Sequence, residues 1–129
     1  MGDSLFQCFA KGMLAVQGKD RDLATVPWNE HRDFKGVFLK NIVLAEHTKN
    51  LLTCHLVRIE PGCRIGKHVH PDSMELHEVV AGGGSCITES GEIAYTPGVV
   101  AVLPENSPHE VVAGEVGLCL FAKFVTVPK

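Results

Sequence analysis

Turn signals divide most of this chain into short extended segments, and this division limits the folds that it can adopt. Gly, Pro, Asn and Ser gather at residues 60–62 (EPG), 82–84 (GGG), 96–98 (TPG) and 105–108 (ENSP). The apolar runs between such clusters recur at intervals of roughly 8 to 12 residues, which is typical of an all-β sandwich or barrel. These intervals leave no room for the crossover helices that a parallel sheet requires. The residues therefore predict an antiparallel, all-β fold.

The expected strands belong to one domain that follows an N-terminal arm. A chain of 129 residues can bury one hydrophobic core but not two. We expect the arm, or a short helix, at residues 1–25, where the apolar side chains of Phe6, Phe9, Met13 and Val16 recur at helical spacing. The barrel domain is expected at residues 26–129. Its predicted strands are 26–28, 36–44, 51–59, 64–70, 76–80, 85–88, 92–95, 99–103, 109–113 and 118–127.

Two histidines and a carboxylate stand close together in one of these segments. His68 and His70 are two residues apart, so on an extended strand both rings leave the same face. Glu75 follows a turn-like break at residues 71–74 (PDSM). Imidazole and carboxylate groups suit iron, manganese, nickel, copper or zinc. This spacing therefore predicts a metal site.

The same stretch resembles the first motif of the cupin superfamily. That motif reads Gly, five residues, His-x-His, three or four residues, Glu, six residues, Gly. Every defining position is matched, by Gly62, His68, His70, Glu75 and Gly82.

A second cupin motif also has a counterpart, although the match is incomplete. Gly98, Pro104 and His109 agree with it, whereas Asn106 stands in place of Gly and Ala113 in place of Asn. Asn accepts a left-handed turn conformation more readily than most residues, so the turn is expected to persist at Asn106. The change at Ala113 leaves the metal chemistry untouched.

The resemblance implies a fold and a ligand set. The fold is a conical antiparallel β-barrel of the jelly-roll type with a metal inside. By resemblance, the metal ligands are His68, His70, Glu75 and His109. One divalent transition metal is expected, namely Fe, Mn, Ni, Zn or Cu, and the resemblance does not choose among them. Four protein ligands leave one or two positions open on an ion that prefers five or six, which is typical of a catalytic site.

Cupins carry out many reactions, so the fold alone does not select a function. Our first hypothesis is a mononuclear metal-dependent, dioxygenase-like enzyme that acts on a small oxygen-bearing acid or carbonyl compound. The alternatives are a non-redox isomerase or lyase and a non-catalytic cupin that binds or senses a small ligand. His77, on the same strand face as Glu75, and His55, in the run 51–59, are the candidate catalytic residues. Arg58 and Arg64 are expected to be solvated strand residues, although Arg64 could bind a substrate anion if it turns inward.

Charge and composition limit the classes of partner that this chain is expected to bind. The formal net charge is −3, with 12 basic and 15 acidic residues and no cluster of either sign, which argues against nucleic acid as a partner. The longest apolar runs are about six residues, well short of the roughly 20 that a membrane helix needs. The first residues lack a basic leader, so a cytoplasmic location is expected. Small cupins resemble one another in forming homodimers, and the N-terminal segment and residues 118–122 are the expected contact surfaces.

Overall fold

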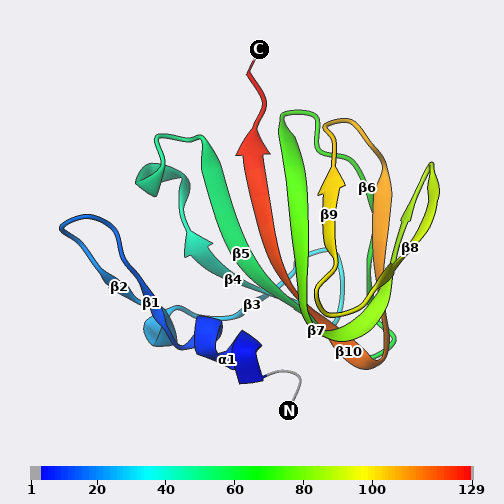
Figure 1. The fold of residues 1–129 in the computed structure, drawn as a ribbon, viewed down its shortest axis with the longest axis horizontal. Helices are drawn as coiled ribbons and strands as arrows, with labels where there is room; N and C mark the ends of the chain where they lie inside the picture. Colours follow the sequence, from blue (N-terminus) through cyan, green and yellow to red (C-terminus); the bar gives the residue numbers. More distant parts are fainter. Residues whose placement is uncertain (1–3, 129) are drawn as a thin grey trace.

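Antiparallel strands make up most of residues 4–128, the part of the chain that the computed structural model describes (Figure 1). One eight-stranded sheet has the order β3-β4-β5-β10-β7-β8, with β6 beside β10 and β9 beside β7. The strands are β3 (Asn29–Glu30), β4 (Val37–Val43), β5 (Leu52–Ile59), β6 (Arg64–His68), β7 (Ser73–Thr88), β8 (Gly91–Tyr95), β9 (Val100–Leu103) and β10 (His109–Thr126). This sheet curls on itself as a jelly-roll barrel, and it confirms the predicted all-β fold.

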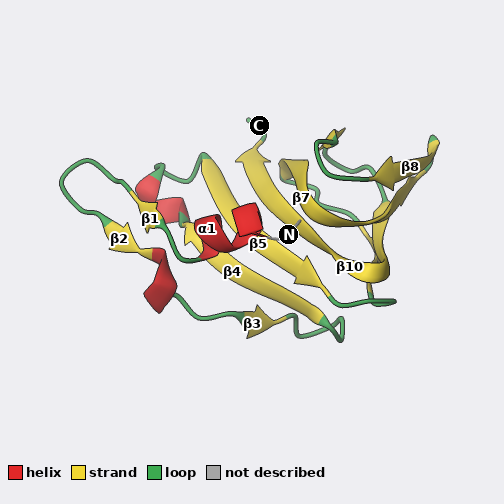
Figure 2. Ribbon diagram, turned by 60° about the horizontal axis from the view of Figure 1, so that its bottom comes forward, coloured by secondary structure: helices red, strands yellow, loops and turns green. Residues whose placement is uncertain are grey.

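The N-terminal segment begins with a short helix, α1 (Ser4–Ala10), which lies across the outside of the sheet (Figure 2). A two-stranded hairpin of β1 (Met13–Leu14) and β2 (Arg21–Asp22) follows, then the 3-10 turn η1 (Leu23–Thr25). A second 3-10 turn, η2 (Ala45–His47), joins β4 to β5. The helix ends before Met13, whose side chain is 64% exposed. The expected helical face from Phe6 to Val16 is therefore wrong beyond Ala10.

Strands β7 and β10 are long because each runs through both halves of the barrel. Residues 73–82 of β7 pair with residues 118–126 of β10, and residues 84–88 of β7 pair with residues 109–113 of β10. The sequence predicts a turn at Gly82–Gly84, whereas β7 continues through these residues and only bends.

Glycine is required at this bend because the two backbones approach closely. Gly82 has a φ of +79°, and a Cβ atom there would lie 2.2 Å from the carbonyl oxygen of Gly117. At Gly84 the corresponding distance to the carbonyl oxygen of Val112 is 2.1 Å. Because real side chains do not tolerate such distances, glycine at these positions allows the strands to bend together and the barrel to close.

The two faces of the sheet carry separate apolar clusters. The inner cluster fills the barrel and includes Val57, Leu120 and Tyr95, each at most 3% exposed. The outer cluster joins α1 to the sheet through Phe6 and Leu56, both fully buried. Burial of one such side chain stabilises the fold by about 1.5–3 kcal/mol. Within residues 4–128, no helix is long and apolar enough to span a membrane.

Candidate metal centre

Four potential ligands converge inside the barrel. His68 is the last residue of β6, His70 follows in the next loop, Glu75 lies on β7, and His109 is the first residue of β10. Their ligand atoms all lie within 4.8 Å of one another. Atoms bonded to one ion at about 2.1 Å are at most about 4.2 Å apart, so movements of about half an ångström would complete a site. The structure thus brings together the four residues that the sequence singles out.

Backbone carbonyl groups orient two of the histidine rings. Nδ1 of His68 donates to the Gly66 carbonyl oxygen at 2.7 Å, and Nδ1 of His109 donates to the Ser107 carbonyl oxygen at 2.9 Å. A carbonyl oxygen can only accept, so the proton of each neutral ring lies on Nδ1. The Nε2 lone pairs are therefore left free to bind a metal. Metal-binding histidines commonly donate their other ring N–H to a carbonyl oxygen in this way.

A turn next to His109 holds the loop that carries His70. Asn106 has a φ of 62°, which confirms the expected left-handed turn. Its backbone N–H donates to the His70 carbonyl oxygen at 3.0 Å. Strand β6 ends at His68, so His70 does not lie on the predicted strand. The two rings nevertheless remain neighbours, with centroids 4.8 Å apart.

Glu75 supplies the negative charge of the centre. Its Oε1 lies 3.0 Å from Nε2 of His109 and 3.5 Å from Nε2 of His70. Burial acts to raise the pKa of Glu75, but hydrogen bonds and charge interactions with His109 and His77 hold that pKa well below its usual range. The buried carboxylate is therefore ionised. At 3.0 Å, the lone pairs of Glu75 and a neutral His109 repel each other unless a proton or a cation lies between them.

The protonation states of the histidines suit a divalent cation. Burial lowers the pKa values of His68 and His70, so both rings are neutral at neutral pH and can donate a lone pair. For His109, burial also acts to lower the pKa, but hydrogen bonds to Glu75 and to the Ser107 carbonyl group outweigh it and leave the pKa raised. The proton between Nε2 of His109 and Oε1 of Glu75 occupies the place that a metal ion bound to both atoms would take. The donor set therefore fits a transition metal.

His77 contacts Oε2 of Glu75, whereas His70 and His109 face the other carboxylate oxygen. Its Nε2 is 2.6 Å from Oε2 of Glu75, and its Nδ1 is 2.9 Å from the hydroxyl group of Tyr95. The ring is only 2% exposed. His77 therefore shares a strand face with Glu75, as expected, and contacts the carboxylate directly. Its predicted catalytic role stays a prediction.

A cavity of about 320 Å³ adjoins the centre, and His55 lines it together with His68 and His70. Nδ1 of His55 lies 2.8 Å from Oδ1 of Asn41, and its Nε2 lies 3.3 Å from the Thr53 hydroxyl oxygen. The remaining residues that line the cavity are mainly apolar: His31, Asp33, Phe34, Leu39, Val57, Ile65, Val69 and Phe124. His55 thus faces the cavity rather than solvent.

This chain also matches the family model of the cupin domain, over residues 55–121. The chain belongs to the cupin family. The matched segment contains all four potential ligands and most of β5 to β10. Among curated proteins, none matches this cupin by sequence.

Solved structures with the same fold are distant in sequence. KdgF from Halomonas sp. is 20% identical, with a TM-score of 0.67 over 80% of this chain and 88% of that chain. A protein from Thermotoga maritima, described as a predicted oxalate decarboxylase, is 18% identical, with a TM-score of 0.75 over 88% of this chain and 100% of that chain. A sugar phosphate isomerase from Silicibacter pomeroyi is 20% identical, with a TM-score of 0.68 over 83% and 75% of the respective chains. At these identities the likeness shows the fold and not the activity.

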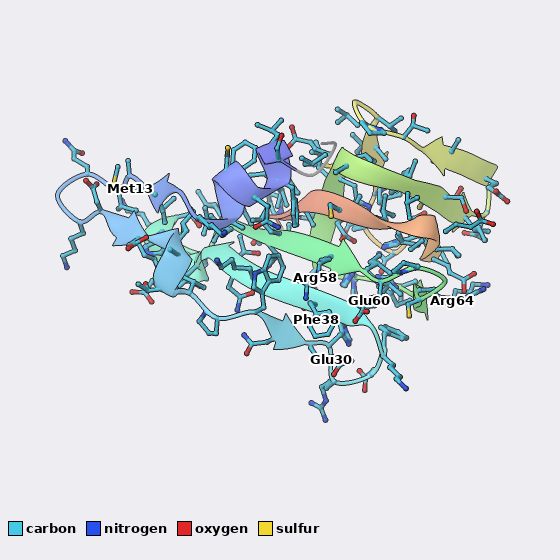
Figure 3. The ribbon with its side chains drawn as sticks, turned by 90° about the horizontal axis from the view of Figure 1, so that it is seen from below. Met13, Glu30, Phe38, Arg58, Glu60 and Arg64 are labelled. Carbon is cyan, nitrogen blue, oxygen red and sulfur yellow. The ribbon has the colours of Figure 1, made fainter. Side chains whose placement is uncertain are left out.

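The two arginines of β5 and β6 lie outside the barrel of this cupin. Arg64 points outward and forms an ion pair with Glu110 at 3.1 Å, so it is not available to a ligand in the barrel. Arg58 lies over the rings of Phe38 and Trp28 on the outer face, as Figure 3 shows for Arg58 and Phe38. These contacts could not be read from the sequence because they depend on strand register.

Four residues that line the cavity or contact its histidines were not predicted from the sequence. His31 appears ordinary in the sequence but lines the cavity, where its ring packs on Phe34 at a centroid distance of 4.8 Å. Phe124 packs against both His70 and His55, at 5.0 and 5.5 Å. Asn41 belongs to β4 and contacts His55 only because β4 pairs with β5. For Asn41 and Phe124 the available signal was strand alternation, which places every second residue of β4 and β10 inside the barrel.

Proposed function

We propose that this cupin is a mononuclear metal-dependent enzyme with dioxygenase-like chemistry, acting on a small carbonyl compound or oxygen-bearing acid. The observation that carries this proposal is the asymmetry of the centre. Glu75 and His109 are buried, whereas His68 and His70 are partly exposed and line the cavity. A ligand set that is closed on one side and open to a cavity on the other is typical of a catalytic metal rather than a structural one.

The four ligands and His55 have separate roles in this proposal. When bound, a divalent metal would polarise a carbonyl oxygen of the substrate, and iron would add oxygen chemistry. His55 acts as the proton acceptor, since it faces the same cavity. Burial lowers the pKa of His55, so its ring is neutral and ready to accept a proton at neutral pH. Asn41 orients the ring through the contact with Nδ1.

The cavity favours a small and mainly apolar substrate. Among the described residues that line it, none is Lys or Arg, and apolar side chains predominate. Its volume of about 320 Å³ is near the lower end of the range for small-molecule sites. A carbonyl or carboxylate oxygen at the metal, with an apolar body against Phe34 and Phe124, fits these properties. A substrate with several phosphate groups does not.

A non-redox isomerase or lyase is the second candidate. The same residues could serve it without oxygen, and the proteins with a similar fold include a sugar phosphate isomerase and a protein described as a predicted oxalate decarboxylase. Proton removal by His55 beside a polarised carbonyl group would begin either kind of reaction. The two candidates differ in whether oxygen is consumed.

The test measures turnover with different bound metals, with and without oxygen, and in one matched variant. Protein loaded with iron, manganese, nickel or zinc is incubated with small 2-oxo acids and β-dicarbonyl compounds, in air and without oxygen. Oxygen uptake by the iron form supports the dioxygenase-like enzyme, and anaerobic turnover by any form supports the isomerase or lyase. His55→Asn should reduce turnover by about 100-fold or more while the protein still binds metal. Binding without turnover for every metal and compound would contradict both and leave a ligand-binding cupin.

We also propose that two copies of this cupin associate through the outer face near α1 and β9. Leu5 and Phe9 on α1 are 57% and 41% exposed, and Val100 and Val102 on β9 are 60% and 56% exposed. In the described sheet, β9 pairs only with β7, so its other edge is open. An apolar patch beside an open strand edge is typical of a protein interface.

A further inference from the structure

A chain of buried hydrogen bonds leads from the metal centre into the core. It begins at Oε2 of Glu75 and passes through His77, with contacts of 2.6 Å to Glu75 and 2.9 Å to the Tyr95 hydroxyl group. The Tyr95 hydroxyl group also hydrogen bonds with the Cys86 thiol. Tyr95 and Cys86 are fully buried, and His77 is 2% exposed. These three side chains do not line the cavity, so a substrate there does not touch them.

The direction of the hydrogen bonds follows from the groups at the two ends. The ionised Glu75 carboxylate can only accept, so Nε2 of His77 carries the proton that it donates to Oε2. On the other side of the ring, Nδ1 of His77 lies 2.9 Å from the Tyr95 hydroxyl oxygen, so a hydrogen bond joins these two atoms. Burial raises the pKa of Tyr95, so the hydroxyl group keeps its proton. Contacts at both nitrogens fix the orientation of the His77 ring, so Tyr95 helps to hold Nε2 against Oε2 of Glu75.

We propose that Tyr95 is a positioning residue for the metal centre: through His77 it holds Oε2 of Glu75 away from the metal, so that Glu75 presents only Oε1. Oε1 is the oxygen that faces His70 and His109. A carboxylate that binds through one oxygen leaves one more position open on the cavity side. This inference rests on the metal site of the proposed function, but it does not depend on which reaction follows.

A purely structural role for Tyr95 makes a different prediction. The ring belongs to the inner apolar cluster, so it contributes to the core whatever its hydroxyl group does. If packing were its only role, loss of the hydroxyl group would change stability and leave metal binding unaltered. The two roles therefore separate in a measurement of metal affinity.

The first experiment uses Tyr95→Phe, which removes only the hydroxyl group. Zinc affinity is measured with a competing chelator, and the visible spectrum of the cobalt(II) form reports coordination geometry. Val37→Ala is the matched control, because Val37 is a fully buried member of the same cluster on a strand without ligands. We expect Tyr95→Phe to bind zinc about 10- to 100-fold more weakly, with an altered cobalt spectrum, and Val37→Ala to bind as the wild type does. Wild-type affinity and spectrum for Tyr95→Phe would overturn the proposal.

A second experiment needs no substitution, so it remains informative if Tyr95→Phe does not fold. Tyr95 is the only tyrosine of the chain, so protein grown on 3-fluorotyrosine gives one fluorine signal that belongs to it. We expect zinc to shift this signal in proportion to occupancy, up to one ion per chain. A signal unchanged at full occupancy would overturn the coupling. Absence of zinc binding by the wild type would instead contradict the proposed function, so the two failures are distinguishable.

Discussion

Substitution of the single residue His109 tests the assignment of the metal ligands. Its ring is 2% exposed and bonds to both Glu75 and the Ser107 carbonyl group. We expect His109→Ala to weaken metal binding by more than about 100-fold, beyond the loss typical of an outer residue. The measurement is metal affinity by equilibrium dialysis, with circular dichroism as the test of folding. His47→Ala is the control, since His47 lies outside the ligand cluster and its ring accepts from the backbone N–H of Leu44. Stoichiometric metal in folded His109→Ala would contradict the ligand assignment.

The buried position of His55 makes the unfolding free energy depend on pH. Burial lowers its pKa below the ordinary histidine value of about 6.5, so between the two values the unfolded chain binds a proton that the folded chain does not. The stability that His55 contributes is present above about pH 6.5 and is lost as the pH falls through its folded pKa. We therefore expect the difference in unfolding free energy between wild type and His55→Asn to shift against the wild type on acidification. Urea unfolding near pH 7 and near pH 5, with chelator present, measures it, and a pH-independent difference would contradict the account.

The residues of the centre differ in how far sequence could predict them. His68, His70 and Glu75 lie within one short stretch, so spacing alone indicates a shared site. His109 was accessible only through the resemblance to the second cupin motif. No sequence pattern indicates a role for Tyr95 at the centre, because its contact with His77 depends on the curvature of β7.

The bend of β7 shows how elements position the site. Glu75 and His77 lie on one side of the bend, and Cys86 lies on the other. The bend therefore lets a single strand supply both a ligand and the end of the hydrogen-bond chain behind it. The glycines at residues 82–84 indicated a turn, because a local pattern cannot distinguish a chain reversal from a bend inside a paired strand.

Two neighbouring glycines, Gly83 and Gly84, differ in how closely the backbone of another strand approaches them. A Cβ atom at Gly84 would lie 2.1 Å from the Val112 carbonyl oxygen, whereas one at Gly83 would have its nearest neighbour at 3.8 Å. Neither residue has a positive φ, so the comparison isolates the steric clash. We expect Gly84→Ala to lower the unfolding free energy by about 1–3 kcal/mol, and Gly83→Ala to change it by less than about 0.5 kcal/mol. Urea denaturation measures both, and equal effects would contradict the proposed origin of the bend.

At the scale of the whole molecule, the outer apolar face predicts a homodimer. We expect the wild type to have twice the chain mass of 14.0 kDa in light scattering after gel filtration. Val102→Glu places a charge in the exposed patch on β9 and should give a monomer. Val116→Glu is the control, because Val116 is 78% exposed but lies at the bend of β10. A monomeric wild type, or a dimer that Val102→Glu leaves intact, would contradict the proposed interface.

The fold of the whole molecule was more predictable than its cavity. Turn spacing predicts antiparallel sheet, and the cupin motifs imply the barrel; both are confirmed. The cavity wall, in contrast, includes His31 and Phe34 from the connection between β3 and β4, whose course no periodicity determines. Because the wall decides which ligand fits, the substrate class could not be narrowed before the structure placed these side chains.

The most direct test of the central claim is the metal content of the wild-type protein. Elemental analysis, expressed as metal per chain, is made on protein purified without added metal or chelator and again after reconstitution. The account predicts close to one transition-metal ion per chain, bound through His68, His70, Glu75 and His109. Protein that holds no stoichiometric metal even after reconstitution would contradict it, since the four converging side chains would then form a pocket without an ion.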